Sequence, residues 1–382
     1  MGPIPQAAPT SSPLAVELGA PAVEPVETKG RPPKPPRRPT SPDGIIVVDK
    51  PQGITSHDVV ARLRRLCGTR AVGHGGTLDP MATGVLICGI GKGTKLLTYV
   101  SGSDKAYTAT IRLGIATTTD DAEGQITSAP GARYPDHSCD PAAPERGAQD
   151  LNRESILTAI DSLTGEIEQV PTKVSAIKVN GKRAYDLVRE GEEVELKARP
   201  VTVSEFTVTD IVNAEQDGVP VVDLLVNVVV SSGTYVRALA RDLGEALGVG
   251  GHLTMLRRTR IGKVGLDRAQ TLKQLEELAD TLRTGTLRSC DCAQDDGERA
   301  QNDVGGGEPL PTMPLGEASG LFMPTRLISD DEARDLSQGK FIAKGETDST
   351  TAALTDSGKL VAIIEPFNQT RAKPKVVFPW EP

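Results

Sequence analysis

The residues with the clearest chemical potential lie in segment 73–86, which reads GHGGTLDPMATGVL. Two consecutive glycines allow a tight backbone there, and Asp79 follows them in a position that Pro80 keeps away from helical backbone angles. A carboxylate held on a rigid turn close to a histidine, here His74, suits nucleophilic or acid–base catalysis. The same residues are also typical of a simple Asp-Pro turn, because both residue types favour turns.

The charge around this segment differs from that of the whole chain. Residues 50–112 carry nine basic and three acidic side chains, a local charge of +6, whereas the 382 residues together have a formal charge of −8. The basic residues are Lys50, Arg62, Arg64, Arg65, Arg70, Lys92, Lys95, Lys105 and Arg112. A uniformly basic coat is excluded, but a local basic field around a carboxylate favours a polyanionic substrate held through its phosphates. A basic helix face that is only solvated is the alternative.

Motifs for cofactors and metals fail on their spacing. Gly89, Gly91 and Gly93 have the spacing G-x-G-x-G, which satisfies neither the dinucleotide fingerprint nor the Walker phosphate loop. The close pair Cys290 and Cys292 has no second pair or nearby histidine, and the four histidines have no ligand spacing. We therefore expect no metal at these cysteines and histidines, and no dinucleotide or phosphate loop at these glycines. Five scattered cysteines form no disulfide framework, which favours a reducing cytoplasm.

Predicted strands and helices surround the chemistry-bearing segment. Apolar runs or alternation predict strands over residues 44–50, 107–113 and 221–232. Helical periodicity predicts one helix between a cap at Thr55 or Ser56 and a stop at Gly68, and two more over 153–164 and 236–247. The inward faces of the last two are expected to be Ile156, Leu157, Ile160 and Leu163, and Val236, Leu239, Ala240, Leu243, Ala246 and Leu247. Interleaving without regular βαβ spacing favours a mixed α+β core over a doubly wound sheet.

Composition divides the chain into four parts. Residues 1–42 are rich in Pro, Ala and Ser and predict an extended, disordered tail, whose basic end either touches nucleic acid or is merely solvated. Residues 43–284 form the expected catalytic domain, with 129–150 as an exposed insertion of low apolar content. Residues 285–320 are expected to be a linker or disordered insertion, and 321–382 a small β domain. No apolar run is long enough to span a membrane, and the N-terminus lacks the pattern of a secretory signal.

Four segments, read together, resemble the TruB family of tRNA pseudouridine synthases. They are KPQGITSHDVV, GHGGTLDPMATGVL, DKAYTATIRLG and SSGTYVRALARDLG, and the LRR at 256–258 also fits. The resemblance covers roughly residues 44–270, with a weaker match of 321–382 to a PUA-like RNA-binding domain. It implies a pseudouridine-synthase-like fold, with a mixed, largely antiparallel sheet, flanking helices and a small C-terminal PUA-like β domain.

The resemblance also implies a reaction and its catalytic residues. The family converts uridine 55 in the T loop of tRNA to pseudouridine, moving the glycosidic bond from N1 to C5 without cofactor or metal. Asp79 matches the catalytic aspartate, which attacks C1′ or the uracil ring or assists elimination at C2′; the sequence leaves all three open. Arg237 matches the arginine that pairs with this aspartate. Tyr107 matches the tyrosine that stacks on the flipped uracil and is a candidate to take the C5 proton.

Five further residues match substrate-binding or supporting positions of the family. Tyr235 matches a second substrate-contacting tyrosine, and Leu256 matches the leucine that lines the uracil pocket. His74 matches the histidine that fills the space left by the flipped nucleotide. Lys50 belongs to the K-P motif that supports the catalytic loop, and Lys95 is a candidate phosphate contact. Without the resemblance, each of these has an ordinary structural interpretation, such as a core leucine or a turn histidine.

The implied partner is the T arm of tRNA, with the target base extruded from its stack. We expect a cytoplasmic monomer that needs neither a membrane nor a protein partner. Two alternatives are a guide-RNA-dependent synthase of the dyskerin type, which shares the catalytic motifs, and a tRNA-folding chaperone that needs no chemistry. The roles of the tail and of the two insertions are not determined by the sequence.

Overall fold

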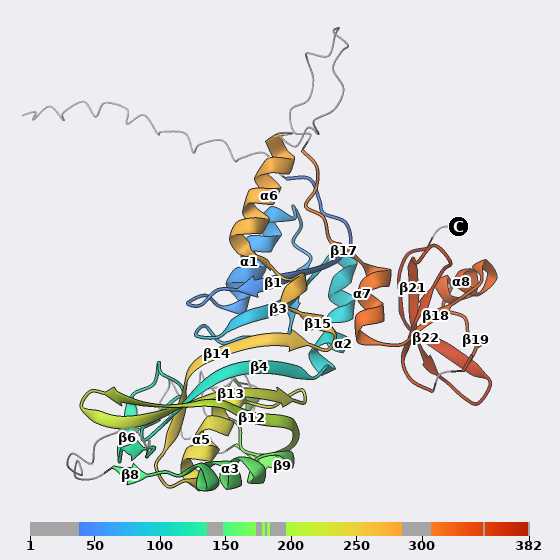
Figure 1. Cartoon of the computed structure of the whole chain (residues 1–382). Helices are drawn as coiled ribbons and strands as arrows, with labels where there is room; N and C mark the ends of the chain where they lie inside the picture. Colours follow the sequence, from blue (N-terminus) through green and yellow to red (C-terminus); the bar gives the residue numbers. More distant parts are fainter. Residues whose placement is uncertain are drawn as a thin grey trace, which may run out of the picture. The chain divides into compact units, whose positions relative to one another are not determined.

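A computed structural model describes residues 38–135, 148–172, 178–179, 182–183, 196–284, 307–346 and 348–380. Within these ranges the largest sheet has eleven strands (Figure 1). In spatial order, eight of them are β16 (Gln270–Thr271), β1 (Gly44–Lys50), β3 (Thr83–Ile90), β14 (Gly251–Ile261), β4 (Lys105–Leu113), β13 (Val219–Val230), β12 (Arg199–Gln216) and β9 (Gly165–Gln169). The other three are β2 (Val72–Gly75) beside β3, β15 (Val264–Gly265) beside β14 and β17 (Met313–Pro314) beside β1.

Most pairs in this sheet are antiparallel, and the parallel ones are β1 with β16 and β3 with β14. The helical segments of this part are α1 (Ser56–Leu66), η1 (Gly91–Leu96), α2 (Leu97–Gly102), α3 (Arg153–Ser162), α5 (Val236–Ala246), η2 (Leu266–Arg268) and α6 (Leu272–Thr284). Short two-stranded sheets are β5 (Ala116–Thr117) with β6 (Ile126–Ser128), β7 (Ala132–Arg133) with β8 (Gln149–Asp150), and β10 (Lys178–Val179) with β11 (Lys182–Arg183). The α+β class with a mixed, largely antiparallel sheet is confirmed.

The C-terminal part is a small β domain, as the sequence predicts. Its elements are α7 (Leu315–Phe322), β18 (Thr325–Leu327), α8 (Asp330–Ser337), β19 (Ile342–Ala343), β20 (Thr351–Leu354), β21 (Leu360–Pro366) and β22 (Arg371–Val377). The five strands are ordered β18-β20-β21-β22-β19. Ser329 caps α8 through a capping box with Glu332, which is the local signal that makes this short helix recognisable in the sequence.

The first strand shows why an unbroken apolar run was a sound strand signal. Successive side chains of a strand point to opposite faces, and both faces of β1 are covered. Ile46 and Val48 belong to an apolar cluster that includes α1 and α6, whereas Ile45 and Val47 belong to another that includes Phe378 of the C-terminal part. The sheet is therefore a doubly covered platform at this position.

The helix that follows β1 begins and ends where its capping signals lie. Thr55 is the N-cap of α1 and forms a capping box with Asp58. The chain before β1 packs against the end of this helix: the amide of Ser41 donates to the carbonyl of Cys67 at 3.0 Å, and Arg38 pairs with Asp280 at 2.7 Å. The prediction of a disordered tail up to residue 42 is therefore wrong for residues 38–42, and Arg38 has an intramolecular carboxylate partner. Residues 1–37 lie outside the described ranges.

Several other expectations need correction. Residues 307–320 are not a linker, because Met313 pairs with Ile45 and α7 buries Ala318. The insertion 129–150 is not exposed throughout: Ala132 is fully buried, while 136–147 lie outside the described residues. Leu157 was expected on the buried face of α3 but is 40% exposed. Ala159 lies on that face together with Ile156 and Ile160.

Two helix and strand faces also differ from expectation. Ala246, at the end of α5, is exposed. The strand predicted over 221–232 is not buried throughout, since residues of β13 alternate between buried and less buried positions. Apolar periodicity shows which residues share a face, but it does not show whether another segment covers that face. It therefore cannot predict that the end of a helix or one face of a strand is exposed.

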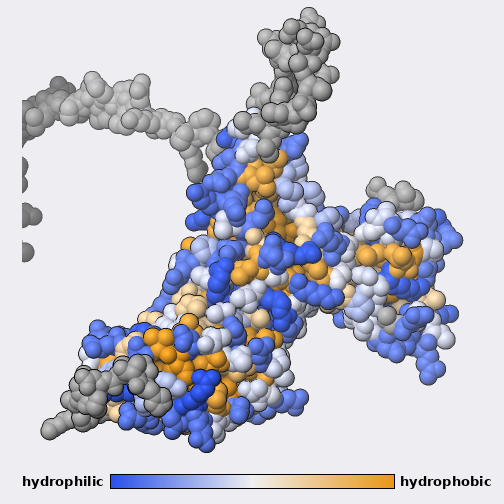
Figure 2. All heavy atoms as spheres, viewed as in Figure 1, coloured by the Kyte–Doolittle hydropathy of each residue, from blue (hydrophilic) through white to orange (hydrophobic). Residues whose placement is uncertain are grey.

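The visible surface is mostly hydrophilic. Figure 2 shows apolar residues gathered around β12 and β13 and beside α6. Val212 of β12 contributes an exposed apolar side chain. No described helix is long and apolar enough to cross a membrane.

Gly84 allows β3 and β14 to meet in parallel close to the end of the loop that carries Asp79. A Cβ at Gly84 would lie 2.1 Å from the carbonyl oxygen of Arg258, and φ there is +102°. Gly84→Ala should therefore lower the free energy of unfolding by more than about 2 kcal/mol, measured by chemical denaturation. The control is Gly102→Ala at the end of α2, where nothing lies within 4 Å of an added Cβ. Similar losses for both variants would contradict the packing argument.

Candidate active site

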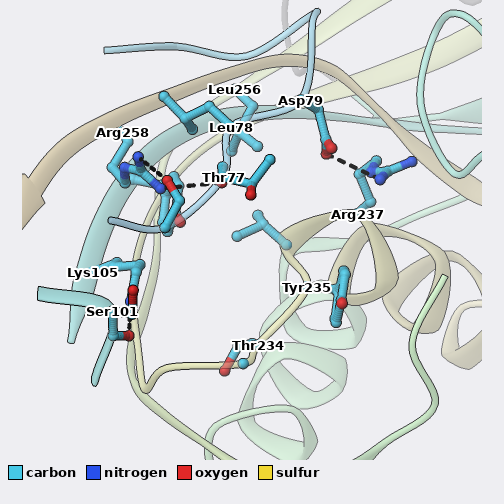
Figure 3. A pocket seen from close by; sticks show the side chains of 14 residues that line it. Thr77, Leu78, Asp79, Ser101, Lys105, Thr234, Tyr235, Arg237, Leu256 and Arg258 are labelled. Carbon is cyan, nitrogen blue, oxygen red and sulfur yellow. Dashed lines mark hydrogen bonds and ion pairs between the residues drawn. The ribbon is translucent and has the colours of Figure 1, made fainter. Parts of the chain in front are cut away.

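A pocket opens where the loop between β2 and β3 faces β4, β14 and the start of α5 (Figure 3). Its volume is about 280 Å³. The residues that line it are Gly76, Thr77, Leu78, Asp79, Ser101, Lys105, Tyr107, Gly233, Thr234, Tyr235, Val236, Arg237, Leu256 and Arg258. Five residues singled out from the sequence are among them: Asp79, Tyr107, Tyr235, Arg237 and Leu256. They come from segments up to 177 residues apart, which the sheet brings together.

Asp79 and Arg237 form an ion pair across the top of this pocket. The Nη2 atom of Arg237 lies 3.0 Å from Oδ2 of Asp79, as the dashed line in Figure 3 marks. The Asp79 side chain is 38% exposed, whereas that of Arg237 is only 7% exposed. Arg237 can therefore hold the carboxylate in place, while the carboxylate stays open to a ligand.

Arg237 also binds a second carboxylate that the sequence analysis missed. Its Nη1 atom donates to Oδ2 of Asp121 at 3.1 Å and to the carbonyl of Thr119 at 3.0 Å. The Asp121 side chain is 5% exposed. Arg237 is thus fixed from behind by a buried acid and presents its other edge to Asp79. In the sequence, the two adjacent acids of TTTDD were the one feature that could have drawn attention to Asp121. Its partner Arg237 lies 116 residues further along the chain, so the pairing could not be inferred from the sequence.

The neighbouring acid, Asp120, has an unusual environment. It pairs with Arg241 at 3.3 Å on the next turn of α5. Burial raises the pKa of Asp120 to about 6, although the nearby guanidinium groups of Arg241 and Arg237 act in the opposite direction. Desolvation outweighs attraction here because the carboxyl group has lost most of its water.

Buried side chains hold the loop that carries Asp79 from below. The Oγ atom of Ser56 donates to the carbonyl of Leu78 at 3.0 Å and accepts from its amide at 2.9 Å. The ammonium group of Lys50 donates to the carbonyls of Ile54 at 2.7 Å and Pro80 at 3.3 Å. The loop is therefore fixed through its peptide groups on both sides of Asp79.

Lys50 is a supporting residue and not a pocket residue. Its side chain is fully buried under the loop, and burial lowers its pKa to about 8. The structure thus fits the support of the catalytic loop that the resemblance implied. A direct contact of Lys50 with the substrate stays a prediction, and in this structure its ammonium group points into backbone carbonyls.

The walls of the pocket are partly apolar. Tyr107 of β4 is 8% exposed and lies opposite Arg258 in the sheet register, while Leu256 of β14 is 6% exposed. Tyr235 is the N-cap of α5, and its amide donates to Oε1 of Gln169 at 2.8 Å. Two aromatic rings and a leucine beside a carboxylate suit a flat heterocyclic base.

His74 and Lys95 do not line the pocket. His74 lies in β2 with its ring 5.3 Å from that of His57, and burial lowers the pKa of His74. The Nζ atom of Lys95 donates to the carbonyl of Val377 at 2.9 Å and lies 5.2 Å from the centre of the Phe378 ring. The phosphate contact predicted for Lys95 and the space-filling role predicted for His74 stay predictions.

Two pocket cations were not assigned from the sequence. The Nζ atom of Lys105 donates to the carbonyls of Ser101 at 3.1 Å and Ser103 at 2.7 Å, and burial lowers its pKa to about 8. Arg258 lies beside it with its guanidinium group bonded to loop carbonyls (Figure 3). Both lie in segments that resemble the family, Lys105 in DKAYTATIRLG and Arg258 in the LRR at 256–258. Their position in these motifs could therefore have indicated that they lie at the site. Among the described residues, no cluster of acidic, histidine or cysteine side chains suits a metal ion.

Comparison with known proteins defines the class. Residues 64–236 match the TruB family pseudouridylate synthase N-terminal domain, 237–290 match the tRNA pseudouridylate synthase B C-terminal domain, and 323–379 match the tRNA pseudouridine synthase II C-terminal domain. The fold and the site therefore belong to a pseudouridine synthase. The chain is a member of the TruB family.

Curated relatives agree with this assignment, and a solved structure agrees with the fold. The chain is 49% identical to tRNA pseudouridine synthase B of Arthrobacter sp. (strain FB24), over 88% of this chain and 96% of the relative. It is 44% identical to the protein of the same name from Streptomyces coelicolor, over 89% of this chain and 98% of that relative. A solved H/ACA ribonucleoprotein bound to a substrate RNA containing 2'-deoxyuridine has a TM-score of 0.57 at 23% identity, covering 88% of this chain and 84% of that one. This last similarity supports the fold alone.

The raised pKa of Asp120 predicts a pH dependence of stability. The folded protein binds this proton more tightly than the unfolded chain, so the contribution of Asp120 to stability is present at low pH and is lost as the pH rises through about 6. Asp120→Asn carries no such proton. Its stability relative to the wild type should therefore improve by up to about 2 kcal/mol between about pH 4 and pH 7, measured by urea denaturation at both values. A difference that is constant with pH, or that shrinks, would contradict this account.

Proposed function

We propose that the protein isomerises uridine 55 in the T loop of tRNA to pseudouridine. The observation that carries this proposal is the ion pair of Asp79 with Arg237 at the edge of a pocket walled by Tyr107, Tyr235 and Leu256 in a TruB-family chain. The reaction breaks the bond from N1 to C1′, forms one from C5 to C1′, moves the C5 proton away and protonates N1. It is balanced without an oxidant or a reductant.

Three residues of the pocket, Asp79, Arg237 and Tyr107, have roles in this reaction. The carboxylate of Asp79 can attack C1′ or the ring or assist elimination, and Arg237 keeps it oriented. The uracil is stacked in its RNA loop and has to be extruded to reach a carboxylate at this position. Stacking on Tyr107 offsets part of that cost, at about 1–3 kcal/mol per base. The Tyr107 hydroxyl is the candidate acceptor of the C5 proton.

We infer that the partner is the T arm of tRNA, recognised by shape and through phosphates by the basic surroundings of the pocket. The chain is expected to act as a monomer in the cytoplasm without a guide RNA, a protein partner, a cofactor or a metal. A guide-RNA-dependent activity and a chaperone role without chemistry are the alternatives that experiment has to separate.

The decisive substitution is Asp79→Asn. Purified wild-type protein should form pseudouridine at position 55 of an unmodified tRNA transcript with nothing added. Asp79→Asn should lower the rate by at least about 10⁴-fold, because an essential catalytic group is lost. The matched control is Asp331→Asn, an exposed carboxylate on α8, which should retain full activity. The readout is product quantified by mass spectrometry.

The outcomes of this assay separate the three hypotheses: a synthase that acts alone, a guide-RNA-dependent synthase and a chaperone without chemistry. A wild type that is inactive on bare tRNA but active with a guide ribonucleoprotein would replace the proposal by the guide-dependent alternative. Asp79→Asn that binds tRNA normally and fully supports cellular function would favour the chaperone reading.

The role of Tyr107 can be tested by two substitutions. Tyr107→Leu removes the stacking ring and should weaken the binding of the flipped state, at a cost of about 1–3 kcal/mol. Tyr107→Phe keeps the ring but removes the hydroxyl, so it should bind tRNA normally and turn over slowly. Normal turnover of Tyr107→Phe in single-turnover assays would exclude the hydroxyl as the proton acceptor.

A further inference from the structure

Arg258 is a fully buried arginine whose partners are all carbonyl groups. It is 1% exposed. Its Nε atom donates to the carbonyl of Val85 at 2.7 Å, Nη2 to that of Gly76 at 3.0 Å and Nη1 to that of Thr77 at 3.4 Å. Among the described residues, no carboxylate forms an ion pair with it. Burying a guanidinium group is costly unless its N–H groups are bonded, so these carbonyls compensate for the lost water.

The neighbouring arginines of β14 are paired in the usual way. Arg257 binds both carboxylate oxygens of Asp49, at 2.8 and 3.1 Å, and Arg260 pairs with Asp104 at 2.9 Å. Side chains alternate along a strand, so Arg258 projects to the same face as Leu256, toward the pocket, while Arg257 projects away. One strand thus carries two adjacent arginines: Arg258 bonds the carbonyls of Gly76 and Thr77, whereas Arg257 bonds Asp49 and, at 3.3 Å, the hydroxyl of Thr83 at the start of β3.

Among the described residues, Arg258 supplies hydrogen bonds to the carbonyls of Gly76 and Thr77, to which neither Ser56 nor Lys50 donates. β3 and β14 are already joined through the backbone at residues 83–84 and 257–258. The peptide of Leu78 is held by Ser56, and the carbonyl of Pro80 is held by Lys50. In Figure 3, Arg258 approaches the start of this segment from one side of the pocket, whereas Arg237 meets its end from the other. The segment 76–79 is therefore bonded by an arginine at each end, by Arg258 at Gly76 and Thr77 and by Arg237 at Asp79.

We propose that Arg258 is a positioning residue for the reaction: its guanidinium group fixes the carbonyls of Gly76 and Thr77 and thereby places Asp79 against the everted nucleotide. The proposal rests on the proposed function. It differs from a purely structural role, in which Arg258 would only join β3 to β14 through Val85.

Kinetics separate the two roles. Arg258→Gln should lower the single-turnover rate of pseudouridine formation by about 100-fold, the loss typical of a reacting group misplaced by about 1 Å. The affinity for tRNA should be unchanged, because no substrate contact is removed. Arg258→Lys should retain an intermediate rate, since an ammonium group can still reach part of the carbonyl set. The control is Arg257→Gln, which breaks the pair with Asp49 and the bond to Thr83 but leaves the bonds to the carbonyls of Gly76 and Thr77 intact. An equal loss of rate in the control, or a loss explained by weaker binding, would overturn the proposal.

A second readout needs no activity. In the free enzyme, amide hydrogen exchange of the peptide covering residues 76–82 should speed up in Arg258→Gln and not in Arg257→Gln, with a peptide from β21 as the internal reference. If the wild type makes no pseudouridine but this difference is seen, the proposed function fails and the placement of the loop by Arg258 stands. If the exchange of the loop is unchanged in both Arg258 variants, the proposal is wrong.

Discussion

The site depends on Arg237 standing between two carboxylates. Asp121 binds it from the buried side and Asp79 from the pocket side, and the guanidinium group itself is almost entirely removed from water. A buried cation of this kind is tolerated only when its hydrogen bonds and charge are compensated, and here the compensation comes from a fixed acid behind it. The direction of Arg237 is therefore set by the protein interior, and the position of the Asp79 carboxylate follows from it.

The remaining contacts turn a flexible hairpin loop into a fixed one. Gly76 has a φ angle of +77°, which lets the chain turn between β2 and β3, and this freedom would leave the loop mobile without restraints. Ser56, Lys50 and Arg258 supply those restraints, each by bonding peptide groups of the loop. None of the three is exposed, so they act by positioning. A carboxylate held in this way reaches a substrate at little cost in reorganisation.

The C-terminal β domain is joined to the catalytic sheet by shared packing. Phe378 is 1% exposed and lies in the same apolar cluster as Ile45 and Val47 of β1. The ammonium group of Lys95 donates to the carbonyl of Val377, next to this phenylalanine. The alternation of β1 explains the arrangement, since one face of the strand supports the catalytic side and the other the contact with the C-terminal domain.

Local signals in the sequence were sufficient for much of this structure. The capping box at Thr55, the apolar run of β1 and the alternation of β4 each depend on residues close in the chain, and so they determined elements before any contact was known. The turn at Asp79 followed from its glycines and from Pro80. Recognition of the family then selected Asp79, Tyr107 and Arg237 out of many ordinary residues. What the sequence determined by itself is therefore the local shape of the chain and, through the family motifs, the choice of candidate residues for the site.

The tertiary structure decided which groups act on which. Arg258 reaches carbonyls 181 and 182 residues away, and Arg237 reaches Asp121 across 116 residues. Neither apolar periodicity nor a capping signal predicts these contacts. The same cause accounts for the errors at Leu157 and at residues 307–320. A side chain is buried, exposed or bonded according to what the fold places beside it, because burial and hydrogen bonding are properties of pairs of segments and not of one segment.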